Sequence, residues 1–315
     1  MIDSSSPPKK DDNSQPKISV VVCTRNRGGL VVQGLETIFA NHYSQYEVIL
    51  VDQSTNDETE KAVVPFQKYA NFRYIHSDTV GTGRSRNIGL FNAEGEIVAY
   101  TDDDCDVPSN WLEKTAFVFN EQPKVALVYF DVQPGPHDTK AGYVPCYIVK
   151  KNRLLRRMRD SFAGYGLGAG MAIRRETFIA IGGFDNNLGP GSIFRSGEDR
   201  DIAIRALLAG WWVYDTNIIS IVHYGFRSWS EGKAHTKRDW FSLGATYIKP
   251  LKCGHWNTLI VFFSGPILKG LFEPLINIFQ LKKPRGFRRW IYYLQGALAG
   301  LRTPIDCKTI LYKLD

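Results

Sequence analysis

The sequence has little cysteine and no apolar run long enough to cross a membrane. Its five cysteines among 315 residues are widely spaced and form no CxxC pair, so we expect neither a disulfide framework nor a zinc site. This cysteine usage fits a reducing, cytoplasmic compartment. Residues 1–16 are polar and lack the apolar core of a signal peptide, which predicts a disordered tail.

Negative charge is scarce in the last part of the chain. Residues 227–315 contain 15 Lys and Arg against 5 Asp and Glu, a net charge of +10, whereas residues 1–226 contain 24 against 27, a net charge of −3. Two uncharged runs, 256–268 and 290–301, separate the basic clusters. Because each run is shorter than the roughly 18–20 residues of a membrane span, we expect amphipathic helices peripheral to the anionic inner membrane surface, and no nucleic-acid partner.

Two alternatives remain for this basic, apolar extension, which we place at residues 236–315. Residues 256–281 could form one span, but Lys269 and Glu273 would then be buried at a cost of about 2–3 kcal/mol each. The extension could also pack on the rest of the chain as ordinary core. If it lies on lipid, the aromatic side chains expected at the interface are Trp256, Phe262, Phe263, Phe272, Trp290, Tyr292 and Tyr293.

The first third of the chain alternates between β-branched runs and helical patterns. We expect strands at 17–23, 46–52, 72–75 and up to residue 102, with helices at 29–41, 57–70 and 84–93 between them. This order predicts an α/β fold with a mostly parallel sheet. Such sheets bind ligands at the carboxyl ends of their strands, where Thr24, Asp52 and Asp102 fall.

Three consecutive carboxylates, Asp102, Asp103 and Asp104, follow the apolar stretch 97–99. At the end of a buried strand they repel one another and lose solvation, which a bound cation offsets. Carboxylate oxygens suit Mg²⁺ or Mn²⁺, and such an ion suits a phosphate. The cluster therefore predicts a metal-bridged ligand that carries phosphate, and the alternative is a solvated turn before Pro108.

Two later features could complete such a site. The Glu198-Asp199 pair could supply a general base, for which we favour Asp199 and keep Glu198 as the alternative. The pair could instead only begin a helix, where carboxylates favour the helix dipole. His223 follows the apolar run 218–222 and so lies at a strand end, where it could bind metal or be structural.

Taken in order, these motifs resemble family 2 glycosyltransferases of the GT-A fold over about residues 17–230. The segments that carry the resemblance are Ile18–Asn26, Val48–Ser54, Gly83–Gly89, Asp102–Asp104, Gly182–Asp185, Gly197–Ile202 and Ile221–Gly225. The resemblance implies a Rossmann-like GT-A catalytic domain, at 17–235 here. It further implies transfer of a sugar, with inversion, from a nucleotide-diphosphate sugar to a glycan or lipid-linked acceptor, with a UDP-sugar favoured and Mn²⁺ or Mg²⁺ as cofactor.

The same resemblance implies roles for single residues. The substrate contacts that it implies are Thr24, Arg25, Asp52, Arg86, Asn87, Asp102 and Asp103. Among these, Asp52 matches the residue that contacts the nucleotide base. The metal ligands that it implies are Asp104, Asp102 and His223, and the base that it implies is Asp199.

Other functions use part of this chemistry. A nucleotidyltransferase acting on a sugar phosphate would also use a metal and a nucleotide, but residues 25–29 match its Gly-rich phosphate loop only weakly. A non-catalytic membrane-surface binding protein with the same fold would not need the carboxylates. The segment 150–159 has six cations with Leu154, Leu155 and Met158 between them, which predicts a basic loop or helix near membrane or acceptor, or a solvated loop.

Overall fold

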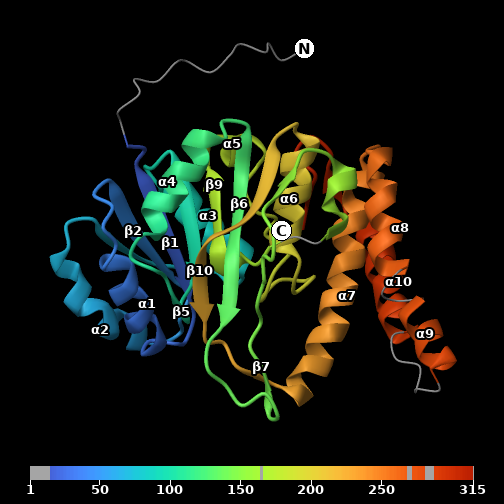
Figure 1. The fold of residues 1–315 in the computed structure, drawn as a ribbon, viewed down its shortest axis with the longest axis horizontal. Coiled ribbons are helices and arrows are strands. Elements are labelled where there is room, and N and C mark those ends of the chain that lie inside the picture. Colours follow the sequence, from blue (N-terminus) through green and yellow to red (C-terminus); the bar gives the residue numbers. More distant parts are fainter. Residues whose placement is uncertain (1–14, 164–165, 268–271, 281–286, 315) are drawn as a thin grey trace.

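The computed structural model describes residues 15–163, 166–267, 272–280 and 287–314, which form a layered α/β fold (Figure 1). Within these residues a nine-stranded sheet has the order β3-β2-β1-β4-β9-β6-β10-β5, with β8 paired to β10. The strands are β1 (Ile18–Thr24), β2 (Tyr46–Asp52), β3 (Phe72–His76), β4 (Ile97–Asp102), β5 (Cys105–Asp106), β6 (Val125–Pro134), β8 (Arg153–Leu155), β9 (Met171–Arg174) and β10 (Trp212–His223). Strands β3, β2, β1, β4, β6 and β10 share one direction, so the sheet is mostly parallel, as predicted.

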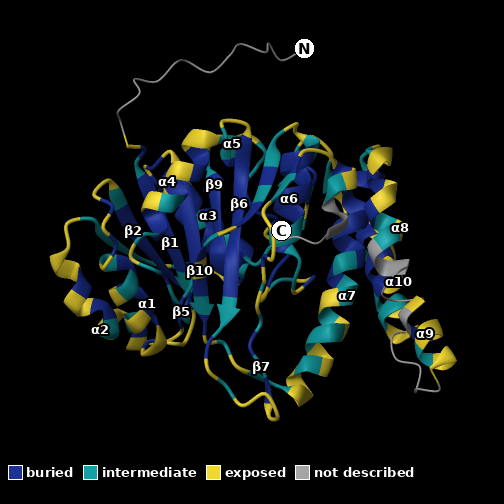
Figure 2. Cartoon of the chain, viewed as in Figure 1, coloured by how far each residue is buried: buried dark blue, intermediate teal, exposed yellow. Residues whose placement is uncertain are grey.

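The sheet is buried between two layers of helices (Figure 2). In β1, Val20 and Val22 join the core under α1 (Leu30–Phe39) and α4 (Trp111–Glu121). Val21 points to the other face, where the core includes side chains of α3 (Thr82–Asn92), α5 (Arg175–Ala180) and α6 (Glu198–Leu208). Because successive strand residues face opposite sides, a strand covered on both faces needs the uninterrupted apolar run that the sequence shows.

The predicted elements of the first third are present, with shifted ends. The helix expected at 57–70 divides into α2 (Glu58–Val63) and a 3-10 turn (Val64–Lys68), because Pro65 cannot donate the backbone hydrogen bond of a continuing helix. Helix α3 begins at Thr82, earlier than predicted, after Gly81 at φ 128°. Positive φ favours glycine, so Gly81 sets the turn into the helix.

The C-terminal extension packs on the α/β part of the chain through one long helix. Helix α7 (Trp229–Lys252) runs across the boundary predicted at 235/236, and α8 (Leu259–Ile267), α9 (Glu273–Phe279) and α10 (Phe287–Arg302) follow. Helices α7 and α10 pack side by side at glycines, since a Cβ on Gly244 would lie 1.9 Å from the Tyr293 carbonyl oxygen. In the part of the chain that the structure describes, no helix combines the length and apolar character of a membrane span.

A fully buried lysine joins α7 to α6. The Lys249 ammonium donates to Asp185 Oδ2 at 2.5 Å and to Asp201 Oδ1 at 2.6 Å, and all three side chains are buried. Asp185 Oδ2 also accepts from the backbone N–H of Tyr312, in the short strand β13 (Leu311–Tyr312) that pairs with β12 (Ile305–Asp306). The charge network therefore ties the chain terminus, the extension and the helix that carries Asp199 together.

The expectation of no disulfide was wrong for one pair. Cys253 and Cys307, at a sequence separation of 54, form a disulfide with their Cα atoms 5.2 Å apart. Spacing gave no sign of it because the packing of α7 and α10 is what brings the two ends together. The cysteine usage therefore does not support a reducing compartment for this chain.

Two apolar features expected at a membrane are instead core. Tyr293 is fully buried and its hydroxyl donates to the Phe262 carbonyl oxygen at 2.6 Å, so this ring does not reach a lipid interface. In the basic segment, Leu155 and Met158 are buried, and β8 pairs with β10. A three-residue edge strand is too short to show a periodic pattern in sequence, which is why the segment resembled a surface loop.

Replacement of Lys249 by Met is expected to destabilise the protein by about 3–5 kcal/mol, because buried Asp185 loses its counter-ion and buried Asp201 keeps only Arg205. Urea unfolding measures this change, and Lys233→Met serves as a control on an exposed position of the same helix. A loss below about 1 kcal/mol for Lys249→Met, similar to the control, would contradict the structural role given to the lysine.

Candidate active site

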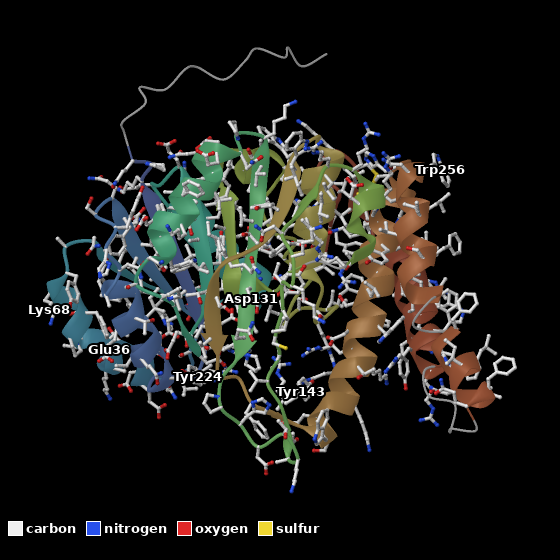
Figure 3. All side chains as sticks on the ribbon, viewed as in Figure 1. Glu36, Lys68, Asp131, Tyr143, Tyr224 and Trp256 are labelled. Carbon is white, nitrogen blue, oxygen red and sulfur yellow. A yellow bond between two sulfur atoms is a disulfide. The ribbon has the colours of Figure 1, made fainter. Side chains whose placement is uncertain are left out.

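The polar ends of β1, β4 and β10 meet at one edge of the sheet. Cys23, next to Thr24, pairs with Asp102, and His223 pairs with Cys105 in the short strand that follows the Asp cluster. Tyr224 lies at the same lower end of the sheet in Figure 3 and donates its hydroxyl to Asp106 Oδ2 at 2.8 Å. Strand geometry alone thus brings together residues 24, 102–104 and 223, as expected for a mostly parallel sheet.

Two of the three predicted metal ligands are in contact. His223 Nε2 lies 3.2 Å from Asp104 Oδ1, and His223 Nδ1 lies 2.8 Å from the Pro145 carbonyl oxygen. That carbonyl accepts the Nδ1 proton and thereby presents Nε2 to the carboxylate. The Cys105 thiol is also near, but burial raises its pKa well above the ordinary value, which keeps it protonated. The Asp102 side chain is 37% exposed, and its Oδ1 lies 3.6 Å from Arg86 Nη2.

The donor set fits a divalent cation. Asp104 Oδ1 is buried without a well-directed hydrogen bond from the described residues, and an orphaned carboxylate oxygen is a free ligand atom. Burial alone would raise the pKa of Asp104, but its contacts with His223 and Arg27 outweigh burial and lower it. For His223 burial alone would lower the pKa, while Asp104 and Asp102 raise it. The pair is therefore held together by opposite charge in the absence of a metal.

Asp103 is buried, and both of its carboxylate oxygens accept hydrogen bonds. Its Oδ2 accepts from the Thr24 hydroxyl at 2.6 Å, and its Oδ1 accepts from Arg27 at 3.0 Å. Burial raises the pKa of Asp103 to about 6 against the opposing contacts with Thr24 and Arg27. Arg27 also donates to Asp104 Oδ2 at 3.0 Å. The sequence analysis gave Arg27 no place in the site, because one arginine in a polar loop carries no pattern.

Arg86 is buried among three carboxylates. Its guanidinium donates to Asp199 Oδ1 at 2.6 Å and to Glu198 Oε1 at 3.2 Å, and it lies 3.6 Å from Asp102 Oδ1. Burial alone would lower the pKa of Arg86, but the carboxylates of Asp199, Glu198 and Asp102 outweigh burial and raise the pKa above its ordinary value. The predicted donor-binding arginine is thus also the link between the Asp cluster and the predicted base.

Asp199 is the more accessible carboxylate of the Glu198-Asp199 pair. Its side chain is 17% exposed against 8% for Glu198. Asp199 Oδ2 accepts the backbone N–H of Gly168 at 2.9 Å, and the Tyr129 hydroxyl donates to its carbonyl oxygen. Burial and the charge of Asp199 raise the pKa of Glu198 to about 8, while Arg86 opposes the rise. Of the two carboxylates, Asp199 is therefore the one more open to an acceptor.

Three predicted substrate contacts stand apart from this cluster. Asp52 is fully buried, and its carboxylate accepts hydrogen bonds from the Ser54 backbone N–H, the Ser54 hydroxyl and the Tyr74 hydroxyl. Contact of Asp52 with the nucleotide base therefore stays a prediction, which requires these groups to move. Asn87 exchanges two hydrogen bonds with the Phe184 backbone and so holds the 182–185 turn. Arg25 is exposed at the end of β1.

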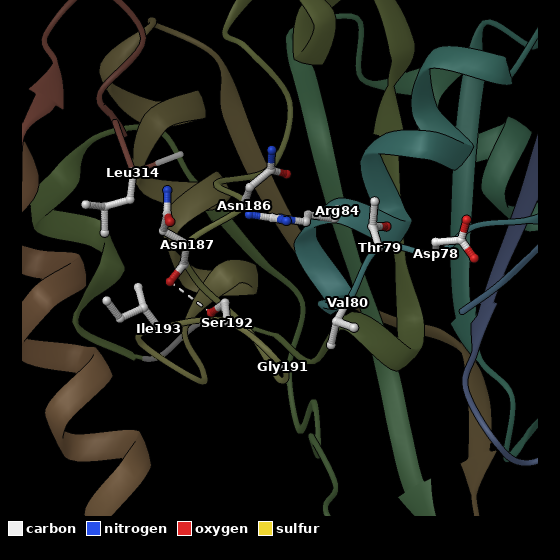
Figure 4. A pocket seen from close by; sticks show the side chains of 10 residues that line it. All are labelled: Asp78, Thr79, Val80, Arg84, Asn186, Asn187, Gly191, Ser192, Ile193 and Leu314. Carbon is white, nitrogen blue, oxygen red and sulfur yellow. Dashed lines mark hydrogen bonds between the residues drawn. The ribbon is translucent and has the colours of Figure 1, made fainter. Parts of the chain in front are cut away.

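A pocket of about 580 Å³ lies beside α3 (Figure 4). The residues that line it are Asp78, Thr79, Val80, Arg84, Asn186, Asn187, Gly191, Ser192, Ile193 and Leu314. Gln53, which follows β2, donates to the Thr79 hydroxyl at 2.9 Å and accepts the Gly81 N–H at 3.3 Å. The pocket thus adjoins the loop after Asp52 but contains none of the predicted metal ligands or base.

Two groups that contact Asp199, the predicted general base, were not predicted from the sequence as site residues. The sequence is rich in glycine over 164–171, and Gly168 makes a close approach, because a Cβ there would lie 2.1 Å from Arg86 Nη2. Tyr129 sits inside a continuous apolar strand, where nothing distinguishes it from core. The glycines were a usable signal, whereas the tyrosine was not.

The comparisons with known proteins agree with this geometry. The family model described as glycosyl transferase family 2 matches residues 19–182. The chain belongs to that family. A glucosyl-dolichyl phosphate glucuronosyltransferase of Haloferax volcanii is 23% identical over 184 residues, which cover 55% of this chain and 57% of the relative. The chain spans 18% of the length of two Rickettsia relatives.

Two solved structures share the fold. The Staphylococcus aureus TarS structure in complex with UDP-GlcNAc has a TM-score of 0.66 and 19% identity, covering 94% of this chain and 84% of that one. The mannosyltransferase PcManGT of Pyrobaculum calidifontis, in complex with GDP-Man and Mn2+, has a TM-score of 0.62 and 17% identity, covering 93% and 89%. The predicted family and the GT-A fold with helices after the sheet are therefore confirmed.

Gly168→Ala is expected to displace Arg86 and destabilise the protein by about 1–3 kcal/mol, since an added methyl meets a buried guanidinium that three carboxylates hold in place. Thermal unfolding measures the loss. Gly29→Ala is the matched control, because a Cβ at that glycine meets nothing within 4 Å. Equal melting temperatures for the two variants would contradict the close approach.

Proposed function

We propose that this family 2 glycosyltransferase transfers a sugar from a nucleotide-diphosphate sugar to an acceptor hydroxyl with the help of a divalent metal. The observation that carries the proposal is the juxtaposition of two chemically different sites on one sheet edge. Asp104 and His223 form an oxygen–nitrogen pair for a cation, and Arg86 joins Asp102 to the accessible carboxylate of Asp199. Transfer from a nucleotide-sugar needs both a stabilised leaving diphosphate and a base.

The metal, Mn²⁺ or Mg²⁺, would be held by Asp104 and His223, with Asp102 as the third ligand that the family resemblance implies. When bound, it supplies charge that stabilises the leaving diphosphate. PcManGT, of the same fold, is described with Mn2+, which supports a divalent ion here. Arg86 is buried close to Asp102, so it adds a fixed positive charge on the side of the site opposite His223.

Asp199 would accept the proton of the acceptor hydroxyl. Its Oδ1 is held by Arg86 and its Oδ2 by the Gly168 N–H, which fixes the carboxylate while leaving it partly exposed. One base and one displacement at the anomeric carbon give inversion, since no second, opposed carboxylate is required as nucleophile. The two solved neighbours are described with UDP-GlcNAc and GDP-Man, so we favour a UDP-sugar and retain GDP as the second nucleotide.

A lipid-linked or surface glycan is the acceptor that we favour. The Haloferax volcanii relative is named for action on a glucosyl-dolichyl phosphate. On α10, Tyr293, Ala297 and Gly300 face the protein, while the opposite side exposes apolar residues at helical spacing. The exposed apolar side chains of the outer face are Trp256, Leu259, Ile260, Phe263, Leu275, Ile276, Ile278, Phe279, Ile291, Leu294, Leu298 and Leu301. Trp256 is labelled at this outer edge in Figure 3.

The segment that carries these apolar residues is basic in sequence, as binding to an anionic bilayer requires. Residues 259–302 contain seven Lys and Arg and one Glu, a net charge of +6. Each cation near an anionic surface adds about 1 kcal/mol, and the apolar side chains enter the headgroup boundary. We therefore propose that the enzyme works as a peripheral protein of the anionic inner membrane surface.

Asp199→Asn is expected to lower nucleoside-diphosphate release from a UDP-sugar by about 10²–10⁴ and to leave UDP affinity nearly intact. Glu198→Gln, which removes the charge of the less exposed carboxylate, is the matched variant and should keep most of the turnover. Turnover assays with Mn²⁺ and calorimetry with UDP give the two readings. An active Asp199→Asn with an inactive Glu198→Gln would reverse the roles, and release of pyrophosphate from a nucleoside triphosphate would favour a nucleotidyltransferase.

Replacement of both Leu294 and Leu298 by Gln is expected to reduce binding to anionic vesicles at least about tenfold, because two side chains leave the lipid-facing stripe. Phe117→Gln, on the exposed side of α4, is the control. Sedimentation with anionic and neutral vesicles at two salt concentrations measures the binding, which high salt should weaken. Wild-type protein that stays in the supernatant under all conditions would contradict the membrane proposal.

A further inference from the structure

Arg27 closes the mouth of the carboxylate cluster. Its Nη1 donates to Asp103 Oδ1 and to Asp104 Oδ2, both at 3.0 Å. The Arg27 side chain is 49% exposed, whereas those of Asp103 and Asp104 are only 5% and 9% exposed. A solvent-facing cation therefore neutralises two carboxylates that are themselves almost inaccessible.

The backbone beneath Arg27 is fixed, so only its side chain can leave. Asn26 has a positive φ of 55°, its N–H donates to Ser54 Oγ at 2.7 Å, and its side chain accepts the Thr55 N–H at 2.9 Å. On the other side a Cβ on Gly28 would lie 2.6 Å from the Glu58 carbonyl carbon, so the chain passes directly against α2. Arginine in contrast has a long, flexible stem, and half of it is in solvent here.

Arg27 and a metal compete for the same carboxylate. Asp104 has two oxygens, of which Oδ1 faces His223 and Oδ2 accepts from Arg27. A divalent ion bound by Asp104 would place a second positive charge beside the guanidinium. Repulsion between the two charges would weaken the hydrogen bond from Arg27 to Asp104. A diphosphate offers that planar guanidinium a bidentate partner of higher charge.

We propose that Arg27 is an exchangeable counter-ion, which neutralises Asp103 and Asp104 in the empty enzyme and moves to the donor diphosphate when a divalent metal binds Asp104. This inference rests on the proposed function, because it needs the metal and the diphosphate. It adds a coupling between the binding of metal and the binding of nucleotide. The metal alone must displace Arg27 from Asp104, whereas with the nucleotide also bound the guanidinium gains a new partner. By linkage each ligand then raises the affinity of the other.

The test is the affinity for Mn²⁺ in the absence of nucleotide, followed through free Mn²⁺ by electron paramagnetic resonance. Arg27→Gln is expected to bind Mn²⁺ about five- to fiftyfold more tightly than the wild type, because the competitor is gone. With Mn²⁺ saturating, the same variant should bind UDP, or GDP if that is the nucleotide, about tenfold more weakly, through the lost charge-assisted hydrogen bonds. Arg27→Lys keeps the charge and should stay near the wild-type Mn²⁺ affinity.

Two controls separate the possible results. Arg25→Gln removes a cation from the same loop but removes no contact with the carboxylate cluster. If Arg25→Gln gains as much Mn²⁺ affinity without nucleotide as Arg27→Gln does, the effect is one of general charge and the exchange is overturned. Unchanged or weaker Mn²⁺ binding by Arg27→Gln would also overturn it, as a purely structural role predicts. Asp104→Asn should lose Mn²⁺ binding. No binding by the wild type, with or without UDP, would instead overturn the proposed metal site itself.

Discussion

The site depends on the contact of one buried guanidinium with carboxylates from two parts of the chain. Arg86 lies on α3, in the strand–helix half of the fold, while Glu198 and Asp199 begin α6, more than a hundred residues later. A buried cation needs counter-charges and buried carboxylates need a cation, so neither element can take its place without the other. The same pairing sets the protonation of the site, because Arg86 and burial act in opposite directions on Glu198.

The C-terminal extension repeats this principle at a second place. Lys249 from α7 reaches Asp185, in the turn that Asn87 holds, and Asp201, one helical half-turn after Asp199. The helix of the predicted base is therefore held by Arg86 at its first turn and by Lys249 two residues later. This is why the extension cannot be treated as an appendage, although its outer face is apolar and its inner face is core.

The sequence predicted the fold and part of the site for a physical reason. Asp104 and His223 follow strands whose apolar patterns are strong, and parallel strands carry such residues to one edge, whereas the role predicted for Asp199 rests on the family resemblance. Contacts between side chains were not predictable in this way. Nothing in the sequence shows that Asp52 is covered by Tyr74, that Tyr293 is core, or that Cys253 meets Cys307, because each depends on how helices and loops pack.

The distribution of exposure separates the two groups of carboxylates by task. Asp103 and Glu198 are both almost inaccessible, and burial raises the pKa of each. Glu198 stands next to the more exposed Asp199, whose oxygens accept from Arg86 and from the Gly168 N–H, and Asp103 stands next to Asp104, which accepts from Arg27. A buried acid beside an accessible one is a way to fix a carboxylate in place without adding a second full charge to the opening. The basic residues at the site, Arg27 outside and Arg86 inside, then differ in mobility rather than in charge. Only the outer one can be exchanged for a ligand, while the inner one holds the two halves of the site together.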